Sequence, residues 1–340
     1  SSYGASAAVW GGRAVRTIGV AAKSVSGTAN TVIRLTSYEM GVSAFGEDAA
    51  DAPGMSTMLK LLFQGGASVV AAVKVDGEDY AAAFAALQTV EDAQVIVCDS
   101  GALEVQQALR ASLESASAIR RERIAVVGMD GASTTELVER AKALNSERMA
   151  LVGPDGLDSA GKTLPGMFAA AAVAAAVAIT RDPAIPLNGT QLPGLGGVSA
   201  AYGDNEIDLL VRGGVTPLEA VGGIVSPVRG ITTRTTTGGA VDATWRELTT
   251  ILIVDDVIPT IRQSLRSRFS QTKNTAQTRG AIRSQTIVEL ENKLKAEIID
   301  SYSDVAVSVY EDDPTVCLVE FSFSVAHGLN QIYLTAHITI

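Results

Sequence analysis

The sequence predicts an α/β domain with a parallel sheet, followed by a domain of the α+β class. Over residues 23–195, short apolar segments alternate with segments of helical length. Strands that are apolar throughout are typical of a parallel sheet with helices on both faces. A stretch rich in Pro and Gly, DPAIPLNGTQLPGLGG, then ends this alternation. After it, helices and strands occur in separate runs, which favours an α+β arrangement.

The first domain is expected to contain four apolar strands and the helices around them. The strands are expected at residues 68–75, 93–99, 124–128 and 149–153. The helices are expected at residues 55–63, 80–87, 102–117, 134–144 and 167–179. The last helix is Ala-rich, and it is too short to cross a bilayer, which needs about 20 apolar residues. Residues 1–22 are rich in Gly and Ala, with a loose strand signal near their end.

The second half is expected to hold long helices at 245–269 and 279–299, with Pro259 as a kink in the first. Two closing strands, 319–326 and 331–340, have apolar side chains at every second position up to the final residue. Such a ribbon has one apolar face and needs a sheet to join. That sheet could be its own, or a neighbour's by strand addition, and the pattern leaves both open.

Composition limits the classes of function. A chain of 340 residues with 47% hydrophobic residues suggests about two domains with packed cores. The net charge of −10 argues against a general binder of nucleic acid or of anionic membranes. Cys98 and Cys317 lie in strand-like runs and are expected to be buried thiols, in a protein made in a reducing compartment, the cytoplasm. No signal peptide is expected from the first residues.

The sharpest chemical motif is GLDSAGKT, which matches the phosphate-binding loop G-x-x-x-x-G-K-[ST]. Its defining residues are Gly156, Gly161, Lys162 and Thr163. A phosphate loop needs a helix that begins at the Gly-Lys-Thr itself. Here Pro165 interrupts that turn, so we interpret the motif as a surface connection without a cofactor. A P-loop NTPase remains the alternative function.

Histidine content bears on hydrolase chemistry. His327 and His337 are the two histidines, and both lie in the terminal ribbon. A Ser-His-Asp site in the α/β domain is therefore excluded by composition.

A basic strip interrupts the acidic chain. Residues 260–288 carry no Asp or Glu. Their basic residues are Arg262, Arg266, Arg268, Lys273, Arg279 and Arg283. Like charges four residues apart on a helix repel, so an acidic neighbour should offset them. That neighbour could be nearby carboxylates of the chain or an acidic protein partner.

The whole chain resembles the tail sheath proteins of contractile phage tails and related bacterial injection systems. The likeness is spread over many weak stretches in the same order, without one diagnostic motif. These include LTSYEMGVSAFG, LLFQGGASVVAAVKV, RMALVGPDG, IDLLVRGGV and IVSPVRGITTRT, followed by much of the C-terminal half.

The resemblance implies a structural protein and not an enzyme. It implies an N-terminal arm (1–22), an outer subtilisin-like domain without a catalytic triad (23–195), an inner α+β domain (196–318) and a C-terminal arm (319–340). The arms would reach into neighbouring subunits. The arm residues would be Val15, Ile18, Val20, Ile332, Leu334, Ile338 and Ile340.

The resemblance also implies the partners. Sheath subunits form stacked hexameric rings around an inner tube, and they contract to drive the tube through a target envelope. The basic strip would face the tube. Baseplate and tail terminator proteins would be further partners, in a virion tail or a phage-like particle such as a bacteriocin, with no nucleic acid or membrane bound directly.

Overall fold

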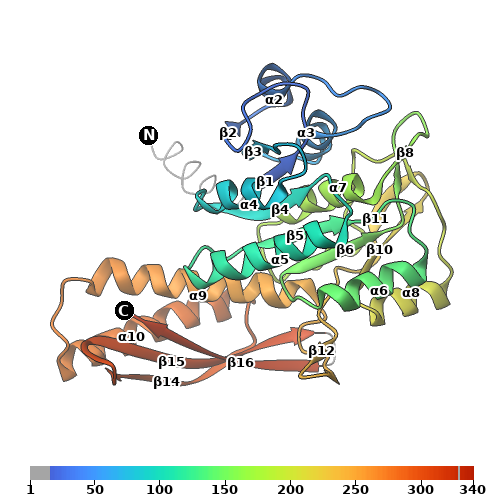
Figure 1. Cartoon of the computed structure of the whole chain (residues 1–340). Coiled ribbons are helices and arrows are strands. Elements are labelled where there is room, and N and C mark those ends of the chain that lie inside the picture. The colour runs from blue at the N-terminus through green and yellow to red at the C-terminus, as the bar shows by residue number, and fades with distance from the viewer. Residues whose placement is uncertain (1–15, 328–329) are drawn as a thin grey trace, which may run out of the picture. The chain divides into compact units, whose positions relative to one another are not determined.

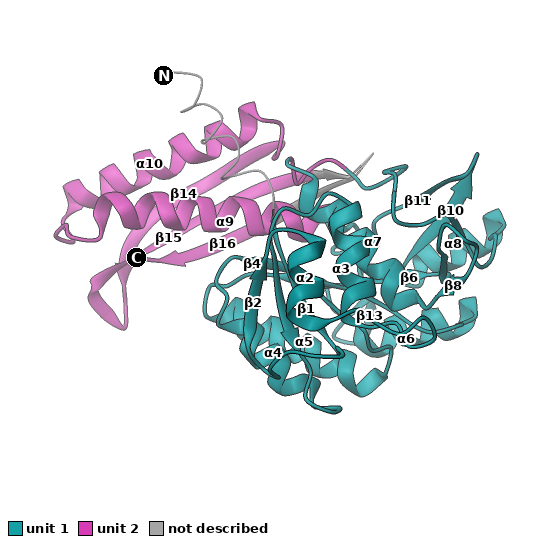
Figure 2. Ribbon diagram, turned by 90° about the horizontal axis from the view of Figure 1, so that it is seen from above, with its two compact units in different colours: residues 1–181, 186–248 teal, residues 182–185, 249–340 magenta. Residues whose placement is uncertain are grey.

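The computed structural model describes residues 16–327 and 330–340, and the chain divides into two compact units (Figures 1 and 2). Unit 1 comprises residues 1–181 and 186–248, and unit 2 comprises residues 182–185 and 249–340. We expected a boundary between residues 195 and 196. The units divide near residue 248 instead, because β10 (Val215–Val221) pairs with β6 (Met149–Gly153) and extends the first sheet.

Unit 1 is built on an eight-stranded sheet with the order β11-β10-β6-β5-β4-β1-β3-β2. The other strands are β1 (Thr17–Ala22), β2 (Val32–Leu35), β3 (Val70–Lys74), β4 (Ala93–Cys98), β5 (Ile124–Gly128) and β11 (Ile224–Pro227). The inner strands run parallel, whereas β11 and β2 pair antiparallel at the two edges. The parallel sheet predicted from sequence is confirmed, with an antiparallel strand added at each edge.

Helices cover both faces of this sheet (Figure 2). One layer consists of α4 (Tyr80–Gln88), α5 (Leu103–Ala118), α6 (Thr134–Leu144) and α8 (Asp204–Arg212). The other consists of α2 (Tyr38–Phe45), α3 (Met55–Gln64) and α7 (Gly166–Ile179). Each predicted helix of the first domain is present within a residue or two. The thiol of Cys98 is free and buried, as predicted, and burial raises its pKa to about 12.

The Ala-rich helix α7 lies in the middle of unit 1, against β4, β5, β6 and α3. All its residues from Gly166 to Ala178 are buried. Its small side chains allow the turn after α3 and strand β5 to lie very close to the helix. A Cβ on Gly65 of the turn after α3 would lie 2.4 Å from the Cβ of Ala175, and a Cβ on Gly128 would lie 2.1 Å from the carbonyl carbon of Gly166.

The N-terminal arm prediction is wrong for the residues that the structure describes. Ile18 and Val20 are fully buried in β1, which pairs with β3 on one side and β4 on the other. The strand signal was correct, but the strand completes the chain's own sheet, because its backbone finds both partners there. Val15 lies outside the described residues.

Two further small sheets complete unit 1. One has the order β8-β7-β9 and contains β7 (Gly156–Leu157), β8 (Thr163–Leu164) and β9 (Gly197–Val198). The other is a hairpin of β12 (Thr236–Thr237) and β13 (Ala240–Val241).

Unit 2 packs two long helices on one face of an antiparallel sheet with the order β14-β15-β16 (Figure 1). Its elements are α9 (Leu248–Phe269), α10 (Ala276–Lys295), β14 (Ser301–Tyr310), β15 (Asp313–His327) and β16 (Asn330–Thr339). Pro259 lies inside α9, as expected. Ile261 and Leu265 of α9 and Phe321 and Phe323 of β15 share one core, and Cys317 is a second buried, free thiol. Among the described residues, no helix has the length and apolarity that a membrane crossing requires.

Candidate assembly surfaces

The GLDSAGKT motif forms a β-hairpin and not a phosphate-binding loop. Gly156 and Leu157 of β7 pair with Leu164 and Thr163 of β8. The amide of Asp158 donates to the carbonyl of Lys162 at 2.9 Å. The next helix begins only at Gly166, so no helix N-terminus points its amides at Lys162 or Thr163.

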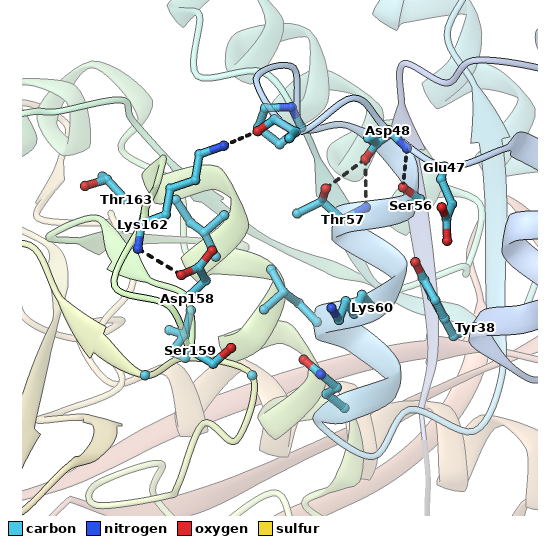
Figure 3. A pocket seen from close by; sticks show the side chains of 18 of the residues that line it. Tyr38, Glu47, Asp48, Ser56, Thr57, Lys60, Asp158, Ser159, Lys162 and Thr163 are labelled. Carbon is cyan, nitrogen blue, oxygen red and sulfur yellow. Dashed lines mark hydrogen bonds between the residues drawn. The ribbon is translucent and has the colours of Figure 1, made fainter.

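The backbone amides of this turn already have an acceptor. The carboxylate of Asp158 accepts from the amides of Ala160 and Lys162 at 2.9 and 2.8 Å (Figure 3). These are amides that would face phosphate oxygens in a nucleotide-binding loop. The side chain of Lys162 is also occupied, since its ammonium donates to the carbonyl of Ala50. The motif therefore forms a hairpin that connects β6 to α7, and its Lys162 does not lie at a helix N-terminus.

A cavity of about 420 Å³ lies between this hairpin and α3 (Figure 3). On its far side, Asp48 accepts hydrogen bonds from the amides of Gly54 and Thr57 and from the Thr57 hydroxyl. Asp48 therefore satisfies free amides at the start of α3, which is a structural role. Asp48 thus accepts from the amides of Gly54 and Thr57 on one side of the cavity, as Asp158 accepts from those of Ala160 and Lys162 on the other.

The basic strip spans the end of α9, the following turn and the start of α10. The structure gives two of its members roles inside unit 2. Arg279 donates to the side-chain oxygen of Asn274 at 2.8 Å, and Arg283 donates to the carbonyl of Val305 at 2.8 Å. Arg262 also has a partner within the chain. The neighbours that offset Arg279 and Arg283 are thus neutral oxygens that tie α10 to adjacent segments.

The other members of the strip are Arg266, Arg268 and Lys273, and all three are exposed. Over the described ranges, none of their side chains forms an ion pair or a hydrogen bond. Sequence alone could not separate these three from Arg279 and Arg283, because that separation depends on which carbonyls the folded chain brings near α10.

The terminal ribbon folds back within its own subunit. β16 pairs with β15 from Asn330 to Thr339, and Ile340 exchanges both backbone hydrogen bonds with Cys317. Ala336 and Ile338 are each 3% exposed and belong to the core of unit 2. Ile332 and Leu334 pair with Val325 and Phe323. The prediction of a C-terminal arm is wrong for this chain, because the backbone of β16 pairs with β15 and Ala336 and Ile338 lie in the core of their own unit.

The outer edge of β16 has backbone groups that β15 does not use. In an antiparallel pair, hydrogen-bonded and non-hydrogen-bonded positions alternate. Since Ile340 and Cys317 form a hydrogen-bonded pair, Thr335 and His337 occupy the alternate positions. Their amides and carbonyls therefore point away from β15, along an edge where the described chain adds no fourth strand.

The face of this sheet that is turned away from the helices is polar. His337 Nδ1 lies 2.9 Å from Glu320, and Ser322 and Thr335 hydroxyls lie 2.9 Å apart. Thr335 and His337 are not among the assembly residues that the sequence predicted. The alternation of polar and apolar residues in the last strand could have identified them. The polar residues at its odd positions are those whose backbone amides and carbonyls point away from β15.

Comparison with known proteins gives consistent likenesses. Residues 73–233 match the phage tail sheath protein central domain, and residues 240–339 match the phage tail sheath C-terminal domain. A tail sheath protein of Bacillus phage SP01 is 30% identical over 181 residues, which is 53% of this chain and 30% of that protein. The match thus covers less than a third of the length of that curated relative.

Solved structures share the fold at low identity. Sheath tail proteins from Desulfitobacterium hafniense and Listeria innocua give TM-scores of 0.78 at 12% and 11% identity. These likenesses cover 96% and 97% of this chain and 97% of each of theirs. The helical sheath of the anti-feeding prophage, solved in its contracted state, gives a TM-score of 0.64 at 15% identity, over 96% of this chain and 90% of that one.

These likenesses identify the class of protein as that of the tail sheath proteins. The two sheath domain matches follow one another and together cover most of the chain. The chain belongs to the phage tail sheath protein family.

Proposed function

We propose that this chain is the subunit of a contractile sheath, in which copies assemble as stacked hexameric rings around an inner tube. The observation that carries the proposal is the consecutive match to both sheath domains. Contraction would rearrange subunits as rigid bodies and drive the tube through a target envelope, with energy stored in subunit interfaces. Unit 1 would be the outer, subtilisin-like domain, and baseplate and terminator proteins would bind the two ends of the sheath.

In this proposal, the edge of β16 accepts a strand from a neighbouring copy. The edge is long, it belongs to a sheet already held by a core, and its outward amides have no partner strand in the described chain. Strand addition uses such edges, since main-chain hydrogen bonds then supply the affinity. The role of β16 therefore changes from a donated arm to a receiving edge.

Replacing Thr335 by proline should abolish assembly while leaving the subunit folded. Proline removes the outward amide of residue 335, and edge strands tolerate proline where the amide faces solvent. Thr335→Ala is the matched control, because it removes the same hydroxyl contact to Ser322 but keeps the amide. Polymer length in negative-stain images measures assembly, and circular dichroism measures folding. Polymers of normal length from Thr335→Pro would contradict the receiving edge.

Deleting the last ten residues would be a less specific test of the edge than Thr335→Pro. Deletion would remove Ala336 and Ile338 from the core of unit 2, so loss of assembly could result from unfolding alone. The proline variant separates the two effects.

We further propose that Arg266, Arg268 and Lys273 face the tube. They are the members of the strip whose charges are not engaged inside the described chain. Acidic residues on the tube would give a modest attachment that salt weakens.

Reversing Arg266 and Arg268 to Glu should lower tube-dependent assembly several-fold at low salt, with a smaller difference at high salt. Folding should be unchanged, because surface substitutions alter stability by about 0.5 kcal/mol or less. The matched control is Lys60→Glu with Lys142→Glu, two exposed lysines of unit 1. Co-sedimentation with purified tube measures the effect. Equal loss in both double variants would mean that net charge, and not the strip, matters.

A further inference from the structure

A projecting apolar tip lies at one edge of the eight-stranded sheet. β10 and β11 form a hairpin in which Val221 pairs with Ile224 across Gly222 and Gly223. Both glycines have positive φ, 60° and 82°, which the tight two-residue turn requires. Val221 is 66% exposed and Ile224 is 47% exposed. We refer to residues 220–224 as the apolar tip.

The base of this hairpin is held firmly. Leu218 and Val225, a few residues from the turn, are each 1% exposed. A Cβ on Gly222 or Gly223 would meet nothing within 4 Å, so the described chain leaves space around the turn. The apolar tip is thus a preorganised projection, so that binding costs little conformational entropy.

A shallow, open and mostly apolar hollow lies at the opposite edge of the same sheet. It has a volume of about 500 Å³ and is formed by β2 and α2. Its lining residues are Ile33, Leu35, Glu39, Met40, Ser43 and Ala44. Met40 is 45% exposed, and methionine adapts its shape to an incoming side chain. β11 and β2 are the two edge strands of the eight-stranded sheet (Figure 1). Unit 1 therefore carries the projection at one edge and the hollow at the other.

We propose that the apolar tip of one copy inserts into the β2–α2 hollow of the next copy. The partner is a second copy, because the sheet separates the two features and one chain cannot bring its own together. A contact between two different surfaces of identical subunits is heterologous, and it propagates into a ring or a helical filament. Those are the symmetries that a sheath needs, so the inference rests on the proposed function and adds a specific lateral contact to it.

A contact between copies explains why the apolar tip and the β2–α2 hollow are both exposed in a single chain. Burying Val221 and Ile224 removes apolar surface from water at both edges of the sheet in every copy, which favours association. Because the contact uses side chains and no backbone ladder, it can slide or release while strand addition at β16 holds copies together.

Val221→Asp with Ile224→Asp tests the contact. Charges at the tip should raise the concentration needed for assembly at least about tenfold, since they would be buried unpaired in the hollow. Val241→Asp is the matched control, because Val241 is 88% exposed beside a second Gly-Gly hairpin turn. That variant should assemble within about twofold of the wild type. Folding should be unaffected in both, since the altered side chains are exposed.

A crosslink distinguishes this contact from other routes to assembly. The variants Val221→Cys and Met40→Cys, each with one added cysteine, should give a disulfide-linked dimer of the two variants when they are mixed and oxidised. Each variant alone should give much less. The native thiols of Cys98 and Cys317 are buried and contribute little background.

The outcomes separate this inference from the proposed function. Normal assembly by the double variant Val221→Asp with Ile224→Asp would overturn the contact, and so would a mixture that gives no preferential crosslink. The sheath role would still stand in either case if Thr335→Pro abolishes polymers. A wild-type chain that forms no polymer, with or without tube, overturns the proposed function. In that case the crosslink still decides the contact, because it requires only two copies.

Discussion

Gly128→Ala should destabilise unit 1 by about 3 kcal/mol, at the upper end of what overpacking costs. The added Cβ would lie 2.1 Å from the carbonyl carbon and oxygen of Gly166 and 2.5 Å from the amide nitrogen of Met167. These are backbone atoms at the start of α7, so no side chain can rotate away. Relief requires that buried α7 shift as a whole, which disturbs its packing on the sheet and on α3.

Urea denaturation of the unassembled chain measures this effect. Gly280→Ala is the control, since its Cβ would meet nothing within 4 Å and it lies inside α10. That change should stabilise α10 by about 0.5–1 kcal/mol, because alanine replaces glycine in a helix interior. Equal unfolding free energies for Gly128→Ala and the wild type would show that β5 and α7 do not approach so closely.

Arg123→Met should cost about 2–4 kcal/mol of stability, because it leaves buried carbonyl groups without their donors. Arg123 is 2% exposed. Its guanidinium donates to the carbonyls of Leu87, Val90 and Arg121 at 3.0, 2.8 and 3.0 Å. Burial lowers the pKa of Arg123 to about 10, so the group remains charged at neutral pH.

Arg123→Lys separates charge from geometry. An ammonium keeps the charge but has no planar fork of donors, so it should recover less than half of the loss. Arg212→Met is the control, because Arg212 pairs with Asp208 on the surface of α8, and such a pair contributes about 0–1 kcal/mol. If Arg123→Met were as stable as the wild type, water would have to reach these carbonyls.

Much of unit 1 could be predicted from sequence. The strands around Val95, Val126 and Leu151 are continuous apolar runs, and the helices between them keep helical spacing. These patterns arise from local geometry and burial, so they are visible in a short window. The weakness of the GLDSAGKT motif could also be predicted, because Pro165 prevents a helix from starting at Lys162.

The surfaces could not be predicted in the same way. Arg266 and Arg283 look alike in sequence, yet Arg283 binds the carbonyl of Val305 and Arg266 stays exposed. Val221 and Ile224 look like ordinary strand residues, and only the sheet order places them at an edge.

The sequence by itself determined which residues form helices and strands, and which face of each is apolar, because periodicity records burial along the chain. Only the tertiary structure decided what each apolar face meets. Ile18 and Ile338 have the patterns of strands in need of a partner, and a pattern does not name the partner. Pairing is long-range, so it depends on which edges the rest of the fold leaves open. In this chain both strands complete their own sheets, and the outer edge of β16 is open to a neighbouring copy.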